Sequence, residues 1–239
     1  MIYYKKVFKQ IKFFYYFNDL LKLIIENIKV YLLSNNKLVF IQIPRTNSSL
    51  IKDIIQNKVK IKSMFYISDH FLKPKYSNPN KYFVSIRDPI DRFVSAYFHL
   101  KNNQFKSFYG DFFKVYPNIN VLAEKIFSKK AQNYIRLSHH INENFQTFFN
   151  IEKLRKNKPF FVIDINNFEN DIQLFFKFIL KDKKKIRLNF NKKKIKKYKS
   201  YLSLKSRRNL KKYLAKDYFI YHELKKIRKK IIYKMKFNI

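Results

Sequence analysis

Short apolar runs alternate along the chain with segments whose apolar residues recur every three or four positions. The runs predict four strands, over 38–43, 62–67, 82–86 and 159–164. Helical spacing predicts helices over 49–56 and 166–180 and an amphipathic helix over 90–100. Nearly continuous apolar strands are typical of a parallel sheet covered on both faces, and the helices between them supply the crossover connections. The pattern therefore predicts an α/β fold with a parallel sheet flanked by helices.

The C-terminal part of the chain predicts helices of a different character. Residues 202–239 are periodic enough for one or two helices, with an apolar stripe of Tyr213, Leu214, Phe219, Ile220, Leu224, Ile227 and Ile231. The middle, 111–150, indicates helices of irregular length. Because no repeat and no Pro/Ser-rich linker interrupts the chain, we expect 37–239 to be a single domain, with 181–239 as its basic helical C-terminal part.

The first 36 residues form a separate segment, which is basic and aromatic with apolar residues at helical spacing. No apolar run in 1–36 approaches the roughly 20 residues of a membrane span, and no small-residue cleavage site follows. We expect a helical N-terminal extension, either packed on the domain or making peripheral contact with a membrane surface. With no cysteine and no signal peptide, a cytoplasmic location is the simplest expectation.

The net charge of the chain indicates which class of molecule it binds. The 239 residues include 53 Lys or Arg and 16 Asp or Glu, a net charge of +37. An AT-rich coding sequence favours Lys, Asn, Ile, Phe and Tyr, but it does not explain so few acidic residues. Segment 181–239 alone holds 24 basic and three acidic residues, a net charge of +21. A balance of this kind favours polyanions, either nucleic acid, an anionic membrane surface or small phosphorylated and sulfated molecules.

Cysteine is absent and glycine occurs once, which excludes several kinds of site. Zero cysteines exclude disulfides, thiolate metal sites and a cysteine nucleophile, and no metal site is expected. The single glycine, Gly110, excludes the Gly-rich phosphate loops of P-loop and dinucleotide-binding proteins in their usual form.

The segment Pro44-Arg45-Thr46-Asn47-Ser48-Ser49 joins a predicted strand to a predicted helix. It places a guanidinium and several hydroxyls at the carboxyl end of a strand, where ligands of open α/β sheets bind. The N–H groups of the helix N-terminus also favour an anion there. The alternative is an ordinary helix capped by a serine.

A second segment, 85–97, begins at the end of the third predicted strand and continues into a helix. Arg87 ends the strand, Asp88-Pro89 is a good N-cap and first-turn pair, and Arg92 and Ser95 share one face of the helix. Positions 45, 87 and 92 take three of only nine arginines, whose planar fork grips phosphate in a bidentate manner. The alternative is that Arg87 and Arg92 pair with Asp88 or Asp91 on the surface.

Together the two segments resemble the sulfotransferases that use 3′-phosphoadenosine 5′-phosphosulfate (PAPS), particularly the carbohydrate-type sulfotransferase family 2. That family carries P-K-T-G-G-T-S between a strand and a helix, where this chain has Arg45 for the lysine and Asn47 and Ser48 for the glycines. Asn tolerates left-handed backbone better than most residues. The family's R-D-P-x-x-R-x-x-S-x-Y is matched at every fixed position, by Arg87, Asp88, Pro89, Arg92, Ser95 and Tyr97. Weaker similarity covers 161–171, 188–192 and 213–221.

The resemblance implies a P-loop-NTPase-like sheet of sulfotransferase type and transfer of a sulfuryl group from PAPS to a hydroxyl, expected to belong to a sugar or glycan. It implies that Arg87 and Ser95 hold the 3′-phosphate. It also implies that the first segment binds the 5′-phosphosulfate through Arg45, Thr46, Asn47, Ser48 and Ser49. Arg45 would in addition stabilise the charge that develops on the leaving phosphate.

A base has to take the proton of the acceptor hydroxyl, and histidine is the usual choice. His70 follows a predicted strand, beside Asp69, in a stretch where some family members carry a base. His140, next to His139, is the second candidate. His99 lies within a predicted helix and is expected to be a surface or core residue.

Other function classes stay open at this stage. The basic C-terminal segment with its many Tyr and Phe residues is also typical of a nucleic-acid-binding protein. A sulfotransferase fold without activity fits the substituted glycines. A P-loop kinase is disfavoured because the lysine and glycines of its phosphate loop are missing.

Overall fold

The computed structural model describes residues 21, 37–57, 63–68, 81–102, 110–138, 140–180 and 201–237. For residues 236 and 237 it describes the backbone alone. The predicted N-terminal extension therefore lies outside the described residues except for Leu21, which is exposed in a helix. In the described part of the chain, no helix is both long and apolar enough to cross a membrane. The expected boundary between 1–36 and 37–239 stays a prediction.

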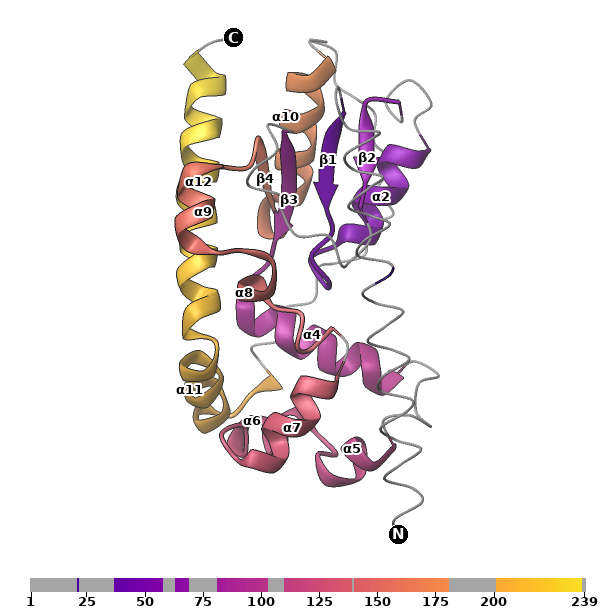
Figure 1. The fold of residues 1–239 in the computed structure, drawn as a ribbon, viewed down its shortest axis with the longest axis vertical. Coiled ribbons are helices and arrows are strands. Elements are labelled where there is room, and N and C mark those ends of the chain that lie inside the picture. Colours follow the sequence, from indigo (N-terminus) through magenta and orange to yellow (C-terminus); the bar gives the residue numbers. More distant parts are fainter. Residues whose placement is uncertain are drawn as a thin grey trace.

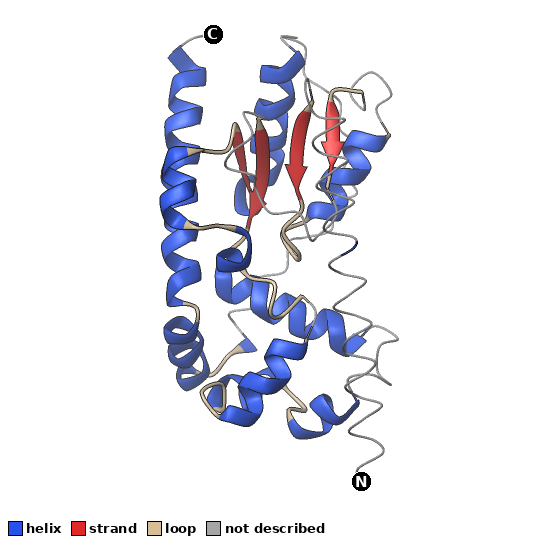
Figure 2. Ribbon diagram, in the orientation of Figure 1, coloured by secondary structure: helices blue, strands red, loops and turns tan. Residues whose placement is uncertain are grey.

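Four parallel strands form the sheet, as the apolar runs predict (Figure 2). They are β1 (Leu38–Ile41), β2 (Phe65–Ile67), β3 (Tyr82–Ile86) and β4 (Phe161–Asp164), in the order β2-β1-β3-β4. Val39 lies opposite Tyr82 in the β1–β3 pair, and Ser85 lies opposite Ile163 in the β3–β4 pair. The ends of β1 and β3, where the two motifs begin, are therefore neighbours in the sheet.

Helices cover both faces of this sheet, so the α/β architecture with flanking helices is confirmed. One face packs against α8 (Phe145–Phe148), α9 (Ile151–Lys156) and α12 (Ala215–Phe237). The other face packs against α2 (Ser48–Gln56) and α10 (Phe168–Leu180). This second face is aromatic, with the ring centroids of Phe40 and Phe83 4.7 Å apart and those of Phe83 and Phe175 4.4 Å apart. A short 3-10 turn, Ile165–Asn167, leads from β4 into α10.

A second, all-helical half lies beyond the carboxyl ends of the strands (Figure 1). It consists of α4 (Pro89–Asn102), α5 (Gly110–Val115), α6 (Ile119–Glu124), α7 (Lys129–Leu137) and α11 (Leu204–Tyr213). The expectation that the helix after β3 is amphipathic is wrong for its first nine residues, because Pro89 to Tyr97 are all buried. The helix enters the core of this half and has neighbours all around it, so its polar residues are buried together with its apolar ones.

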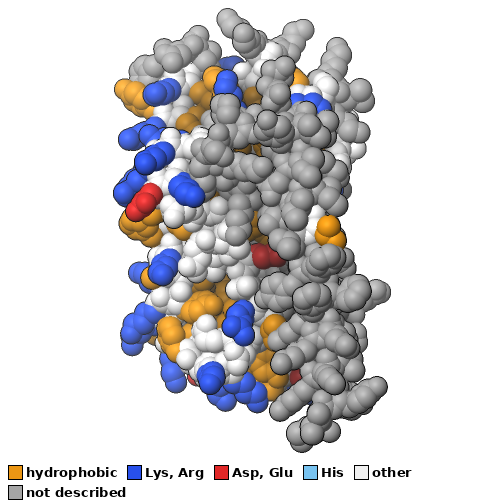
Figure 3. Space-filling view, in the orientation of Figure 1, with side chains coloured by type: hydrophobic (Ala, Val, Ile, Leu, Met, Phe, Trp, Pro, Cys, Tyr) orange, Lys and Arg blue, Asp and Glu red, His pale blue; other side chains and the backbone are white. Residues whose placement is uncertain are grey.

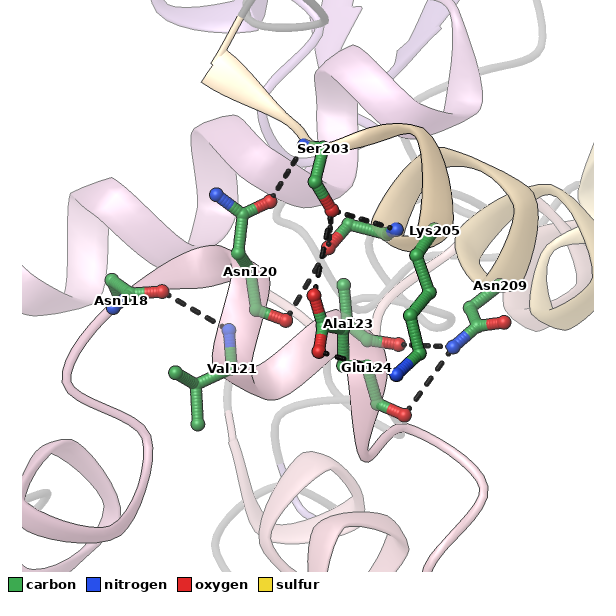
Figure 4. A network of polar contacts seen from close by, with 9 residues as sticks. Asn118, Asn120, Val121, Ala123, Glu124, Ser203, Lys205 and Asn209 are labelled. Carbon is green, nitrogen blue, oxygen red and sulfur yellow. Dashed lines mark hydrogen bonds and ion pairs between the residues drawn. The ribbon is translucent and has the colours of Figure 1, made fainter.

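A polar network joins α11 to α6 (Figure 4). The Ser203 backbone N–H donates to Asn120 Oδ1 at 2.9 Å, and Asn209 Nδ2 donates to the carbonyls of Ala123 and Glu124 at 3.2 and 3.3 Å. Ser203 is also the N-cap of α11, because its Oγ accepts from the Ser206 N–H at 3.1 Å. The start of α11 is thus fixed before the chain turns into α12.

The long helix α12 links the parts of the molecule and runs along one side of both halves (Figure 1). Tyr218 packs on the core of the helical half and on the first sheet face, while Ile231 packs on both sheet faces. Most of the predicted apolar stripe faces inward, but Phe219 is 51% exposed, which corrects the expectation for that residue. Its ring lies instead beneath the guanidinium of Arg155 from α9, 5.9 Å from the ring centroid.

An ion pair fixes α12 against the sheet. Arg228 donates from Nε and Nη2 to the two carboxylate oxygens of Asp171 in α10, at 2.6 and 2.5 Å. Asp171 is buried and also accepts from the Asp164 N–H at the end of β4, at 2.8 Å. The bidentate hydrogen bonds to Asp171 raise the pKa of Arg228, as expected for a charge-assisted fork.

We predict that Asp171→Ala lowers the free energy of unfolding by about 3 kcal/mol, because it leaves the Arg228 side chain, which is only 13% exposed, without its carboxylate. Arg155→Ala is the control, since Arg155 is 58% exposed and its Nε lies 3.8 Å from Glu223. For that variant we expect a loss below about 1 kcal/mol. Urea unfolding measures both, and equal losses would contradict the structural role of the Asp171–Arg228 pair.

Candidate anion-binding site

The loop between β1 and α2 adopts left-handed backbone twice without a glycine. Arg45 has φ 66° and Asn47 has φ 58°. Asn47 is the N-cap residue of α2, its side chain makes no capping hydrogen bond, and the first turn of α2 carries no acidic residue. Ser48 already belongs to the helix, so of the two positions where the family has glycine only Asn47 adopts left-handed backbone. The helix N-terminus is thus available to an anion without competition from a capping side chain.

Thr46 anchors this loop to the sheet. Its side chain is fully buried, and its hydroxyl oxygen lies 2.7 Å from the Ile43 carbonyl and 2.7 Å from Ser85 Oγ. A hydroxyl has one proton to donate, so when Thr46 donates to Ile43, Ser85 donates to Thr46. This pair ties the loop after β1 to the end of β3. The expected contact of Thr46 with a phosphosulfate stays a prediction, as do those of Ser48, which is buried, and Ser49, which is exposed.

The two motifs meet at this edge of the sheet. Arg45 Nε donates to Ser95 Oγ on α4 at 3.3 Å, and Arg87 Nη1 donates to the Arg45 carbonyl at 3.3 Å. Arg87 and Ser95 are buried, with 6% and 2% of their surface exposed. Two guanidinium groups, a serine hydroxyl and a helix N-terminus therefore converge from segments about 40 to 50 residues apart in sequence.

Asp88 fixes the start of α4. Its Oδ1 accepts from the backbone N–H groups of Ile90 and Asp91 at 3.0 and 3.2 Å, which confirms the predicted N-cap. The hydroxyl of Tyr218 on α12 donates to the same carboxylate, 3.1 Å from Oδ1 and 3.2 Å from Oδ2. Arg87 and Asp88 are thus both held by residues outside the second motif, Arg87 by Arg45 and Asp88 by Tyr218.

Arg92 is a structural residue of the motif. The alternative that it pairs on the surface is wrong, because its side chain is fully buried. Nη1 donates to the carbonyls of His140 and Glu143 at 2.9 and 2.6 Å, and Nη2 donates to that of Ile141 at 3.3 Å. Burial lowers the pKa of Arg92, while the charges of Asp217 and Glu143 oppose that shift. The first two turns of α4 are thereby fastened to the segment before α8.

Of the candidate bases, His140 lies among the described residues. His70 and its neighbour Asp69 lie outside the described residues, and so does His139. His140 has left-handed backbone, with φ 66°, and its Nδ1 lies 3.3 Å from Glu143 Oε2. Its ring centroid is 5.2 Å from that of His99, which follows Ser95 by four residues on α4. One helical turn separates residues four apart, so His140 lies about one turn along α4 from the Arg45–Ser95 contact.

Several residues of the site escape prediction from the sequence. Ser85 is a hydroxyl within an otherwise apolar strand, and that contrast is a signal that could have marked it. Glu143 and Tyr218 have no such signal, because their partners are determined only by the packing of α4 against the segment before α8 and against α12. Among the described residues, no group of three or more His, Asp and Glu side chains is placed to hold a metal ion.

Comparisons of this chain with protein-family models, with curated proteins and with solved structures found no match. Function therefore has to be inferred from the geometry of the site and from the motifs that build it.

We predict that Asn47 tolerates glycine but no β-branched residue. Asn47→Val should lower the free energy of unfolding by about 1–2 kcal/mol, because left-handed backbone brings Cβ against the carbonyl oxygen. Asn47→Gly should change it by less than about 0.5 kcal/mol, since glycine adopts this backbone freely. Urea unfolding of the two variants decides the matter. A glycine variant as unstable as the valine variant would mean that the Asn47 side chain, and not its backbone, is what matters.

Proposed function

We propose that the protein is a PAPS-dependent sulfotransferase that transfers a sulfuryl group to a hydroxyl acceptor, with a sugar or glycan as the expected acceptor class. The observation that carries the proposal is the contact between the two motifs, in which Arg45 bonds Ser95 and Arg87 bonds the Arg45 carbonyl. A donor with a 3′-phosphate and a 5′-phosphosulfate carries both groups on one ribose and requires two anion sites separated by that sugar. These contacts link two candidate anion sites, one on each motif.

The donor set fits this substrate. Guanidinium groups and hydroxyls suit phosphate and sulfate oxygens, and the N-terminus of α2 adds backbone N–H groups with no carboxylate in its first turn. In this proposal Arg87 and Ser95 bind the 3′-phosphate, while Arg45 and the first turn of α2 bind the 5′-phosphosulfate. The finer fold assignment, a P-loop-NTPase-like sheet of sulfotransferase type, belongs to the same proposal and rests on the motifs and the parallel sheet.

In this reaction these residues position the donor and stabilise the charge that develops on it. The acceptor oxygen attacks sulfur, the bond from sulfur to the 5′-phosphate oxygen breaks, and 3′,5′-ADP leaves. Arg45 stabilises the negative charge that grows on that oxygen, an electrostatic effect of the oxyanion-hole kind. The acceptor's proton passes to a base, for which His140 and His70 are the candidates. Glu143 beside Nδ1 would hold the His140 imidazole with Nε2 toward the acceptor.

A second candidate function has one observation in its favour. Among residues 201–235, the exposed side chains include ten lysines and arginines and no carboxylate. They are Lys205, Arg207, Arg208, Lys211, Lys212, Lys216, Lys226, Lys229, Lys230 and Lys234. Basic side chains follow α12 and α11 along one side of the molecule in Figure 3. Such a face suits the phosphate backbone of a nucleic acid.

The leading proposal predicts that 3′,5′-ADP raises the melting temperature. At about 100 times its Kd the ligand stabilises the native state by about 2.7 kcal/mol, which is about 5 °C or more for a chain of this size. Arg87→Ala should abolish the shift, because the 3′-phosphate loses its guanidinium. Arg155→Ala, which removes an exposed arginine of α9, should retain it.

Two outcomes would contradict the proposal. Absence of any shift in the wild-type chain at millimolar ligand would exclude PAPS as the donor and favour an inactive fold. Salt-dependent binding to DNA or RNA that Arg87→Ala leaves intact, with no response to 3′,5′-ADP, would favour the nucleic-acid interpretation. Deleting the basic segment is no alternative test, because it contributes Leu210 of α11, Leu214 between the helices and Leu224 of α12 to the core.

A further inference from the structure

Tyr218 lies outside both motifs and contacts Asp88, near the start of the second one. It lies in the first turns of α12, 130 residues after Asp88, and its hydroxyl donates to both oxygens of the Asp88 carboxylate. Its ring packs on the core of the helical half and on the first sheet face. The hydroxyl is therefore held in place by packing on two sides.

Asp88 connects Tyr218 to Arg87 of the candidate site. The same carboxylate caps α4 through two backbone N–H groups, so its orientation is fixed from the helix and from α12 together. Asp88 follows Arg87 in the chain, and the Arg87 guanidinium donates to the Arg45 carbonyl. A change in the backbone dihedral angles of Asp88 would rotate the Arg87–Asp88 peptide plane and displace the buried guanidinium of Arg87.

The hydroxyl of Tyr218 is also a dependable donor. Burial raises the pKa of Tyr218, and the charge of Asp88 raises it further. Tyr218 thus keeps its proton throughout the physiological range, and a hydrogen bond to a carboxylate is stronger than one between neutral groups. The next residue back, Asp217, is buried and accepts from the Gln146 N–H at 3.0 Å, which fixes the start of α12 itself.

We propose that Tyr218 is a positioning residue that, through Asp88, sets Arg87 for a 3′-phosphate and so determines selectivity for nucleotides that carry one. This inference rests on the proposed function and adds a residue to it that neither motif contains. Tyr218 itself does not touch the nucleotide. Its effect should therefore appear as a loss of selectivity and not as a general loss of binding.

The test is Tyr218→Phe, which removes the hydroxyl and keeps the ring. Isothermal titration with 3′,5′-ADP and with 5′-AMP, which lacks the 3′-phosphate, separates a loss of selectivity for the 3′-phosphate from a general loss of binding. We expect binding of 3′,5′-ADP to weaken about 10-fold, the lower end of what a hydrogen bond to a charged group contributes. Binding of 5′-AMP should stay within about 2-fold, and this unchanged binding also reports that the variant is folded.

Tyr221→Phe is the matched control. Tyr221 is buried on the same helix, with its ring centroid 6.4 Å from that of Tyr218. This variant should leave both affinities unchanged. An equal loss for both nucleotides in Tyr218→Phe, or no loss for either, would overturn the inference while the proposed function stands. A wild-type chain that does not prefer 3′,5′-ADP over 5′-AMP would instead overturn the proposed function, and the inference with it.

Discussion

A fully buried guanidinium, that of Arg92, is the interaction on which the arrangement of the two halves depends. A buried charge is costly unless it is hydrogen-bonded, and Arg92 donates from Nη1 and Nη2 to the carbonyls of His140, Ile141 and Glu143, although its buried Nε has no partner in the described part of the chain. The buried carboxylate of Asp217 on α12 adds a favourable charge interaction. Two segments far from α4 in the sequence, residues 140–143 and the start of α12, therefore meet around its first turns.

Once α4 is held in this way, the site follows from the topology of the sheet. Parallel strands present their carboxyl ends at one edge, and β1 and β3 are neighbours. The loop after β1 is fastened to β3 by the Thr46–Ser85 pair, and α4 leaves β3 with Asp88 as its cap. Arg45, Arg87 and Ser95 then converge with little freedom left. A site preorganised to this degree loses little entropy when an anion binds.

The sequence predicts the elements that local pattern determines. The apolar run predicts a strand over 82–86, and β3 spans Tyr82–Ile86. Helical spacing predicts 49–56, and α2 begins one residue earlier, at Ser48. The Asp88 cap and the carboxyl-end position of both motifs are likewise predictable, because caps and strand ends are encoded by neighbouring residues.

What packing between distant segments determines is not predictable in this way. The helix over 90–100 carries Asp91, Arg92 and Ser95 on a pattern that favours one exposed face, yet all three are buried. Phe219 belongs to an apolar stripe yet lies against Arg155 at the surface. The contact of Tyr218 with Asp88 depends on where α12 crosses α4. In each case the deciding partner is many residues away, and local periodicity carries no information about it.

We predict that the two motifs bind the 3′- and 5′-phosphates of the same nucleotide, and a double-mutant cycle measures whether they act together. Arg45→Lys and Arg87→Lys keep the charges and remove the planar forks, so 3′,5′-ADP binding stays measurable in the single and double variants. We expect a coupling free energy above about 0.5 kcal/mol, as for residues in contact. Effects that add within about 0.3 kcal/mol would mean that the two arginines act independently, and would contradict a nucleotide site shared by the two motifs.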